Sequence, residues 1–398
     1  MRNVYITYAK RTPIGSFAGS LSSVRVDDML ATLFSDFKKN HHFDLKEIDD
    51  VIVGNANGAG EENRNLARMS LILAGFPYEV PGTTLNRLCG SSMDATQMAF
   101  AKIQAGMADA VLVGGAESMS RAPYVMSKAE SSYDRNQKIW DTSIGWRFPN
   151  PKMEVLFPLY GMGETAEEVQ KEYKISRDEQ DAFALSSHQK AIQAIKTGQF
   201  KNEIVPITIK TRKEEKLIDT DEGPRADTSL EKLAKLRAAF REGGTVTAGN
   251  SSSINDGASC LFVASEDFIK KHKLTPLVKI TGGSVAGLHP NVMGLGPIHA
   301  TNKLCKGLGI TPQDFDVLEL NEAFAVQSLA CIKELKLDQA KINLNGGAIA
   351  LGHPLGSSGA RIITTLIHIM QKNKNYKKGL ATMCIGVGQG IALSVENC

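Results

Sequence analysis

The sequence has no cysteine pair at C-x-x-C spacing, little net charge and no long apolar run. The cysteines lie far apart along the chain, and they are Cys89, Cys260, Cys305, Cys331, Cys384 and Cys398. This scatter argues against a zinc site and against a disulfide framework, so we expect no metal. Because free thiols persist in a reducing compartment, we expect a cytoplasmic protein.

A net charge of only +3 over 398 residues offers no electrostatic basis for binding a nucleic acid or a membrane surface. No stretch reaches the roughly 18 consecutive apolar residues of a membrane helix. The first residues, MRNVYITYAKRTPIG, alternate like a strand and leave no room for the apolar core of a signal peptide. With 42% apolar residues, the chain is long enough for two or more substructures packed together.

Short β-branched runs, each followed by a glycine turn and a helical pattern, predict an α/β fold. The same order of pieces occurs twice. In the first half, DDVIVGNANG ends a strand at Asn55, and LNRLCGSSMDA places Cys89 before a helix. In the second half, FDVLELNEAF ends a strand at Asn321, and a later strand leads to His353 before a helix. Two such halves stacked face to face would bring these strand ends toward one cleft.

Residues 119–248 separate the halves with irregular, charge-dense sequence such as KTRKEEK and DTDEGPRADTSLEKLAKLRAAF. One clear helix is predicted there, at SRDEQDAFALSSHQKAIQAI, because Ser176 and Glu179 have the spacing of a capping box. A segment of this kind is expected to be an insertion that covers the cleft.

Cys89 lies between an apolar lead-in and a Gly-Ser-Ser turn that opens a helical pattern. Unpaired backbone N–H groups and the helix dipole favour negative charge at such a position. We therefore expect the thiol to ionise below the roughly 8.5 of free cysteine and to act as a nucleophile. The alternative is a buried cysteine that packs as a small apolar side chain.

Two glycine-rich stretches frame further candidates. In NLNGGAIALGHPLGSSG, the glycines around His353 allow close approach of a ligand, and Pro354 suits a helix start after the imidazole. In MCIGVGQG, Cys384 ends a strand at a turn that can aim a backbone N–H at an oxyanion. The G-x-G-x-G spacing and the strand-like IALSVE that follows exclude a dinucleotide fingerprint. Asn321 either serves the site or caps the helix after it.

Together these stretches resemble the thiolase family over essentially the whole chain. The resemblance rests on RLCGSSMDA, NEAFA, NLNGGAIALGHPLGSSGAR and CIGVGQG, in the family's order, and on GMGETAEEV before SRDEQDAFALSSHQKA. It implies duplicated α-β-α-β-α layered halves with an inserted loop domain that covers the active site and binds coenzyme A. The division that we expect is an N-terminal half, 1–118, completed by 249–270, an insertion, 119–248, and a C-terminal half, 271–398.

The resemblance also implies a role for each catalytic candidate. Cys89 is expected to take the acyl group, and His353 to activate that thiol. Asn321 would hold a water in an oxyanion hole that His353 also lines. Cys384 would exchange protons with the substrate α-carbon and with coenzyme A, and Gly386 and Cys89 would give backbone N–H groups to the other oxyanion hole.

Three further residues are expected to contact coenzyme A or the substrate, by the same resemblance. Arg225 in GPRAD and Ser252 in GNSSSIN match coenzyme A contacts, and Met162 lies in the GMGE motif of the insertion. Some biosynthetic members carry a histidine where this chain has Gly161. This departure, with DTSIGWRFPNP, favours a degradative enzyme for longer 3-ketoacyl or 3-oxoadipyl chains.

The implied reaction cleaves a 3-ketoacyl-CoA with free coenzyme A to acetyl-CoA and a shortened acyl-CoA, and it reverses as a Claisen condensation. Cleavage needs a soft nucleophile, a donor-lined oxyanion site and a second acid/base, which is why two cysteines are present. Coenzyme A is a substrate, and no cofactor is needed. The resemblance places such enzymes in fatty acid β-oxidation and implies a homodimer or homotetramer.

Four other interpretations stay open at this point. An acetoacetyl-CoA-specific acetyltransferase would use the same site. A decarboxylating condensing enzyme would share the doubled fold but resembles a Cys-His-His arrangement. A cysteine hydrolase would release the acid to water, and a non-catalytic acyl-CoA binder would have no use for both cysteines.

Overall fold

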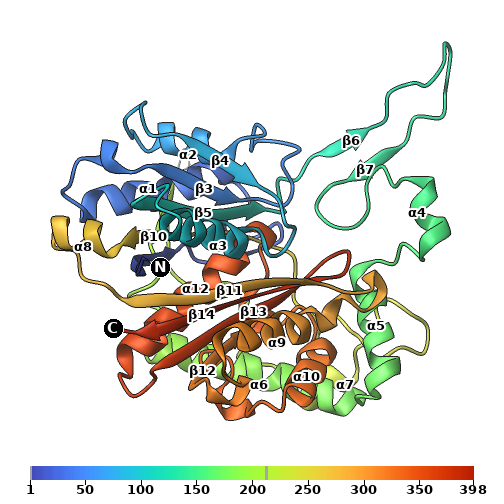
Figure 1. The fold of residues 1–398 in the computed structure, drawn as a ribbon. Coiled ribbons are helices and arrows are strands. Elements are labelled where there is room, and N and C mark those ends of the chain that lie inside the picture. The colour runs from blue at the N-terminus through green and yellow to red at the C-terminus, as the bar shows by residue number, and fades with distance from the viewer. Residues whose placement is uncertain (1, 211–213) are drawn as a thin grey trace.

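The computed structural model describes residues 2–210 and 214–398, and its two larger parts are built alike (Figure 1). The first part contains β1 (Val4–Arg11), β2 (Gly15–Ser16), α1 (Val26–Asn40), β3 (Asp50–Gly54), α2 (Leu66–Leu73), β4 (Gly82–Leu85), α3 (Ser91–Gln104), β5 (Ala110–Ser118), β10 (Asn255–Ser265) and α8 (Glu266–His272). The second contains β11 (Val278–Gly287), α9 (Gly296–Leu308), β12 (Val317–Leu320), α10 (Ala325–Glu334), α11 (Ala348–Leu351), α12 (Leu355–Lys372), β13 (Lys378–Ile385) and β14 (Gln389–Asn397).

The strands form one continuous sheet in the order β12-β13-β14-β11-β1-β10-β5-β3-β4, with β2 against β10. In the first half, β3 and β5 are parallel, and β10 pairs antiparallel with β5. In the second half, β12 and β13 are parallel, and β14 pairs antiparallel with β13. The halves join where β1 and β11 pair at Tyr5↔Lys279 and Ile6↔Val278. The doubled order predicted from the sequence is therefore confirmed.

The layers follow from which faces of the helices are apolar. α3 and α12 pack against each other and against strands of both halves, in a core that includes Met93, Ile363 and Leu393. α12 is buried along nearly its whole length, including polar residues such as Ser357, Arg361 and Thr364, because it packs between the two halves of the sheet. α1 and α2 cover the outer face of the first half, and α9 that of the second. The result is the expected α-β-α-β-α arrangement.

One detail of the repeat differs from the prediction. The strand expected before His353 is reduced to a single parallel bridge between Leu318 and Ile342. The short helix α11 then leads through Gly352 to His353. Glycines at 346, 347 and 352 interrupt this stretch, and glycine disfavours a regular strand.

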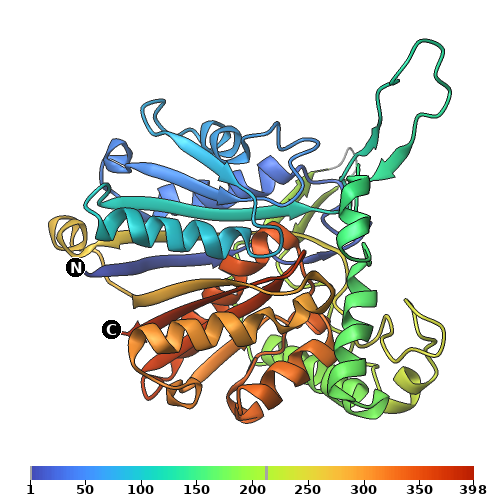
Figure 2. The same cartoon turned by 45° about the vertical axis from the view of Figure 1, so that its right-hand side comes forward.

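The segment between the halves has more regular structure than the sequence predicted. Its elements are β6 (Tyr124–Met126), β7 (Ile139–Asp141), α4 (Pro151–Leu156), α5 (Met162–Tyr173), α6 (Arg177–Lys196), β8 (Ile207–Lys210), β9 (Glu215–Ile218) and α7 (Leu230–Ala234). The capping box at Ser176 and Glu179 is confirmed as the start of α6. α5 was missed because Gly161, at its N-cap, has no capping side chain. Figure 2 shows the β6–β7 hairpin projecting away from both halves.

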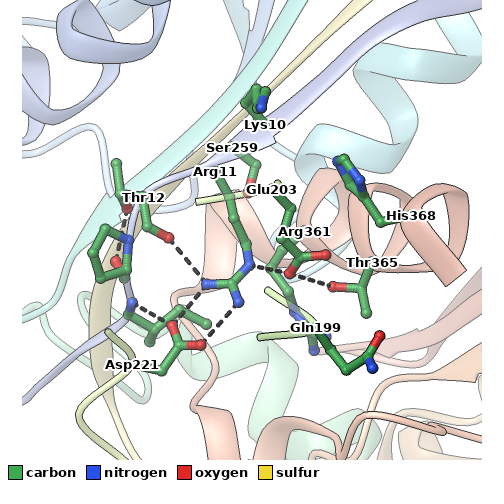
Figure 3. Close-up of polar contacts among 12 residues, drawn as sticks. Lys10, Arg11, Thr12, Gln199, Glu203, Asp221, Ser259, Arg361, Thr365 and His368 are labelled. Atoms are coloured by element: carbon green, nitrogen blue, oxygen red, sulfur yellow. Dashed lines mark hydrogen bonds and ion pairs between the residues drawn. The ribbon is translucent and has the colours of Figure 1, made fainter. Parts of the chain in front are cut away.

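A buried ion-pair network fastens this segment to the sheet (Figure 3). Arg11, at the end of β1, is fully buried and binds Asp221 through two hydrogen bonds of 2.7 and 2.8 Å. Its Nε also donates to Glu203 at 2.7 Å, and Thr365 of α12 donates to the same carboxylate at 3.2 Å. Residues from three distant parts of the chain therefore share one desolvated charge cluster.

None of the helices in the described part of the chain combines the length and the apolar character that a bilayer crossing requires. All six cysteines are free thiols there.

Candidate active site

One cavity of about 400 Å³ collects the three candidates that the sequence singled out. Cys89 reaches it from the first half, and His353 and Cys384 reach it from the second. Met162 and Ser252 also line it. Each of the three reactive side chains stands at the end of a strand or the start of a helix, so the doubled fold carries them to one place.

Cys89 stands two residues before α3, on a turn in which Leu88 has a φ of +47°. A positive φ is unusual for a residue other than glycine and is common at functional sites. The sulfur accepts backbone hydrogen bonds from Gly386 and from Cys89 itself, and both lower its pKa. Burial is the larger effect and raises the pKa of the thiol to about 11. The expectation that the helix dipole makes this thiol acidic is therefore wrong for the free protein.

His353 is nearly fully buried, and its backbone is fixed from the first half of the chain. Its N–H donates to Asn255 Oδ1 at 2.8 Å. Gly352, directly before it, has a φ of +107° and would place a Cβ 2.5 Å from the Asn255 side chain, so only glycine fits there. Burial lowers the pKa of His353 to about 3, with a further contribution from Arg361. The imidazole is therefore neutral near pH 7.

The tautomer of His353 follows from its neighbour Ser358. The Ser358 hydroxyl donates to the Pro354 carbonyl at 2.8 Å, so its single proton is used. It therefore accepts from His353 Nδ1 at 2.7 Å, which assigns the ring proton to Nδ1. Nε2 is left unprotonated, as a general base requires.

Replacing Ser358 by alanine is expected to lower kcat/KM by about 10- to 100-fold, because the buried Nδ1–H loses its acceptor and the base its orientation. Steady-state assays would measure this. Ser357→Ala is the matched control, since Ser357 Oγ contacts Ser259 and not His353. Equal activity of the two variants would contradict the orienting role.

Asn321 follows β12 and is fully buried, yet neither its Oδ1 nor its Nδ2 has a hydrogen-bond partner among the described residues. The helix after it begins at Ala325 with Phe324 as its N-cap, so the capping alternative for Asn321 is wrong. A buried amide without partners is costly, so this side chain is suited to hold a polar group that binds there.

Cys384 and Gly386 stand at the hairpin that joins β13 to β14. Cys384 is 2% exposed, and burial raises the pKa of its thiol well above the usual value, with Cys89 and Cys331 adding to the rise. Val387 and Gly388 have φ values of +61° and +77°, and a β-branched residue rarely adopts the first. This tight turn aims the Gly386 N–H at Cys89.

Glu117 was missed from the sequence and is revealed by the internal repeat. The β3–β5 register aligns Gly54 with Gly115, and the β12–β13 register aligns Leu320 with Thr382. Glu117 therefore occupies the position in the first half that Cys384 occupies in the second. An alignment of GGAES with ATMCI could have found it.

The Glu117 carboxylate is buried and holds the two halves together. It accepts hydrogen bonds from the backbone N–H groups of Ala56, Asn57 and Gly356, the last at the start of α12. The Asn55 side chain donates to it at 3.2 Å, so Asn55 has a structural role. Its counterpart in the second half, Asn321, has no such side-chain partner among the described residues. Burial raises the pKa of Glu117 to about 7, and its charge raises the pKa of Cys89.

Alkylation of Cys89 by iodoacetamide in the free enzyme is expected to accelerate about tenfold per pH unit between pH 7 and 9. The reason is that the thiolate reacts and that the pKa, near 11, lies above this range. Mass spectrometry of the Cys89 peptide would follow it, separately from exposed Cys398. Glu117→Gln should shift the profile to lower pH. A rate independent of pH would show a preformed thiolate instead.

The residues expected to contact coenzyme A lie along two adjoining cavities. A second cavity of about 550 Å³ contains Arg225 and shares Ser251, Ser253 and Ile254 with the first. Arg225 is exposed, and its backbone N–H donates to His188 Nδ1 at 3.1 Å. His188 was missed from the sequence, because a lone histidine within a helix carries no distinguishing pattern. The two cavities therefore lie next to each other, on either side of these shared residues.

Among the described residues, no group of three or more histidine, cysteine, aspartate or glutamate side chains is arranged to hold a metal ion.

Comparisons with known proteins cover the whole chain. The models for the thiolase N-terminal domain and the thiolase C-terminal domain match residues 4–267 and 274–397. Beta-ketoadipyl-CoA thiolase from Pseudomonas knackmussii is 53% identical over 99% of both chains. The crystal structure of Bacillus anthracis acetyl-CoA acetyltransferase has a TM-score of 0.94 at 42% identity, over 100% of this chain and 99% of that one. The crystal structure of human mitochondrial 3-ketoacyl-CoA thiolase in complex with CoA has a TM-score of 0.92 at 38% identity, over 100% of this chain and 98% of that one.

Proposed function

The chain belongs to the thiolase family, and from this premise we propose that it is a degradative thiolase whose substrate is 3-oxoadipyl-CoA. As a thiolase it is an acyltransferase that uses coenzyme A as a substrate and needs no cofactor. The proposal of substrate is supported by the name of the Pseudomonas relative, since beta-ketoadipyl-CoA is the same compound. The observation that carries the mechanism is the meeting of Cys89, His353 and Cys384 in one cavity.

In the first half-reaction, Cys89 attacks the keto carbon of the substrate as His353 Nε2 takes its proton. The bond between the α-carbon and the keto carbon then breaks, which leaves the acyl group on Cys89 and the acetyl-CoA enolate. Cys384 protonates the α-carbon of that enolate. Because both the thiol and the imidazole are neutral at rest, the charge arises only as the reaction proceeds.

In the second half-reaction, Cys384 takes the thiol proton of coenzyme A, whose sulfur attacks the acyl-Cys89 thioester. The Cys89 thiolate leaves and takes back its proton from His353 Nε2. Backbone N–H groups of Gly386 and Cys89 converge on the Cys89 sulfur and would donate to the oxygen of the acyl group. A water on unpaired Asn321, with His353, would hold the enolate oxygen.

The inserted segment, 119–248, is proposed to cover the site and to bind coenzyme A through Arg225, with Ser252 from the segment 249–270 that completes the N-terminal half. Support comes from the adjoining cavities, which these residues line. Met162, at the start of α5, would contact the acyl group beside Gly386. The two residues are close, since a Cβ added to Gly386 would lie 3.7 Å from the Met162 sulfur.

The test compares 3-oxoadipyl-CoA, acetoacetyl-CoA and longer neutral 3-ketoacyl-CoAs, each with and without free coenzyme A. We expect acetyl-CoA release that depends on coenzyme A and is fastest with 3-oxoadipyl-CoA. Preference for acetoacetyl-CoA would favour an acetoacetyl-CoA-specific acetyltransferase, and preference for longer neutral chains would favour fatty acid β-oxidation. Release of free acid without coenzyme A would indicate a hydrolase. Binding without turnover would indicate a non-catalytic acyl-CoA binder.

We further propose a homo-oligomer that works in the cytoplasm, where its free thiols would stay reduced. The projecting β6–β7 hairpin exposes Tyr124, Met126, Tyr133 and Ile139, an apolar surface that a second copy would cover. Replacing Met126 and Ile139 by serine is expected to reduce the oligomer size in light scattering. An unchanged size would exclude the hairpin as a contact.

A further inference from the structure

Part of the wall of the catalytic cavity is formed by apolar or small groups of the segment after β5. Met119, Ile144 and Gly145 form this wall. No lysine or arginine stands among the described residues that line the cavity. Two positions after Gly145, Arg147 stands half-buried beside the wall.

Within the described chain, the acceptors that anchor Arg147 are neutral oxygens. Its Nη1 donates to Asn57 Oδ1 at 3.1 Å and to the Thr142 carbonyl at 3.3 Å, and its Nη2 donates to the Asn57 carbonyl at 2.8 Å. A guanidinium has five N–H donors, so two remain for another acceptor. No carboxylate of the described chain forms an ion pair with it.

Three of the other arginines differ in this respect. Arg87 pairs with Asp94 at 2.8 Å, Arg241 pairs with Glu168 at 2.8 Å, and Arg121 pairs with Glu61. A half-buried cation without a counter-charge is unfavourable until an anion binds. A guanidinium with two free donors is well suited to a carboxylate.

We propose that Arg147 binds the terminal carboxylate of a dicarboxylic 3-ketoacyl-CoA and so selects this class over neutral chains of equal length. The inference rests on the proposed function and assigns it a recognition residue. Cleavage of 3-oxoadipyl-CoA leaves a succinyl group on Cys89, whose free carboxylate is separated from the thioester carbonyl by only two methylene groups. Its counter-charge must therefore stand close to the nucleophile.

The anchor of Arg147 is linked to the nucleophile through Asn57 and Glu117. Asn57, which holds the guanidinium, donates its backbone N–H to Glu117 at 3.1 Å. Glu117 is near enough to Cys89 for its charge to act on the thiol. Ile144 and Gly145, which line the cavity together with Cys89, precede Arg147 by three and two residues in the chain. The neutral wall accommodates the methylene groups, and Arg147 meets the charge at their end.

The experiment measures kcat/KM of the full-length enzyme for 3-oxoadipyl-CoA and for 3-oxohexanoyl-CoA, which has the same chain length without the carboxylate. We expect Arg147→Leu to lower kcat/KM about 10- to 100-fold for 3-oxoadipyl-CoA and less than about threefold for 3-oxohexanoyl-CoA. Arg147→Lys keeps the charge and should recover part of the difference. Arg121→Leu is the matched control, because it removes a charge that Glu61 already neutralises, and it should leave the ratio unchanged.

Protection of Cys89 from iodoacetamide gives a readout that does not need turnover. Succinyl-CoA should protect the wild type at lower concentration than butyryl-CoA does, and Arg147→Leu should abolish this difference. Equal losses with both substrates would make Arg147 a loop anchor and overturn the inference, as would unchanged rates with both. A wild type that cleaves 3-oxohexanoyl-CoA but not 3-oxoadipyl-CoA would overturn the proposed substrate itself.

Discussion

Cys89→Ser should lower thiolytic turnover on the order of 10⁴-fold or more and leave no acyl-enzyme. A serine hydroxyl is a far weaker nucleophile than a thiol near neutral pH. In this site, the neutral His353 would have to remove a much less acidic proton. Intact-protein mass spectrometry after incubation with a 3-ketoacyl-CoA should show the acyl adduct on the wild type and none on the variant.

Cys384→Ser separates the two chemical roles. Its Cys89 is intact, so it should still accept an acyl group from an activated thioester. Carbon–carbon cleavage should fall by about 10²- to 10⁴-fold, because the α-carbon loses its acid/base group. Cys331→Ser is the control, since this buried thiol neighbours Cys384 but does not line the cavity. If Cys89→Ser and Cys384→Ser both kept normal turnover, the assignment of roles would be wrong.

Arg11→Met is expected to destabilise the protein by about 3–5 kcal/mol, because it leaves Asp221 and Glu203 buried without their cation. Methionine keeps the length and apolar bulk of the stem, so the loss reports the charge. Since the network joins β1, the inserted segment and α12, its rupture should also loosen the inserted segment. Thermal and urea unfolding would measure the loss, and limited proteolysis would locate it.

Lys46→Met is the matched control for this prediction. Lys46 also forms an ion pair of 2.7 Å, with Glu79, but both side chains are more than half exposed. Water screens such a pair, so we expect the stability to stay nearly unchanged. Similar stabilities for the Arg11 and Lys46 variants would contradict the importance of the buried cluster.

Local sequence patterns predicted much of this molecule. The doubled order of strands, the start of α6 at Ser176 and the start of α12 after Pro354 agree with the structure. Caps, turns and hydrophobic periodicity depend on a few neighbouring residues, so they can be recognised in the sequence without knowledge of the fold. The motifs around Cys89, His353 and Cys384 belong to this class, since each combines a reactive side chain with a local turn.

The pKa values and the hydrogen-bond partners of these residues depend on atoms from distant segments, so only the folded structure decides them. The helix dipole at Cys89 predicts an acidic thiol, but desolvation by the surrounding elements reverses the direction. Asn55 and Asn321 end equivalent strands, yet Glu117 satisfies the first while the second stays unpaired. Arg147 has no acidic partner among the residues that the structure describes, for the same reason: neighbours in space set the charge balance of each residue. The sequence by itself determined which groups are reactive and where the chain turns, and tertiary packing determined their protonation, their partners and their exposure, because solvation and electrostatics are summed over three dimensions.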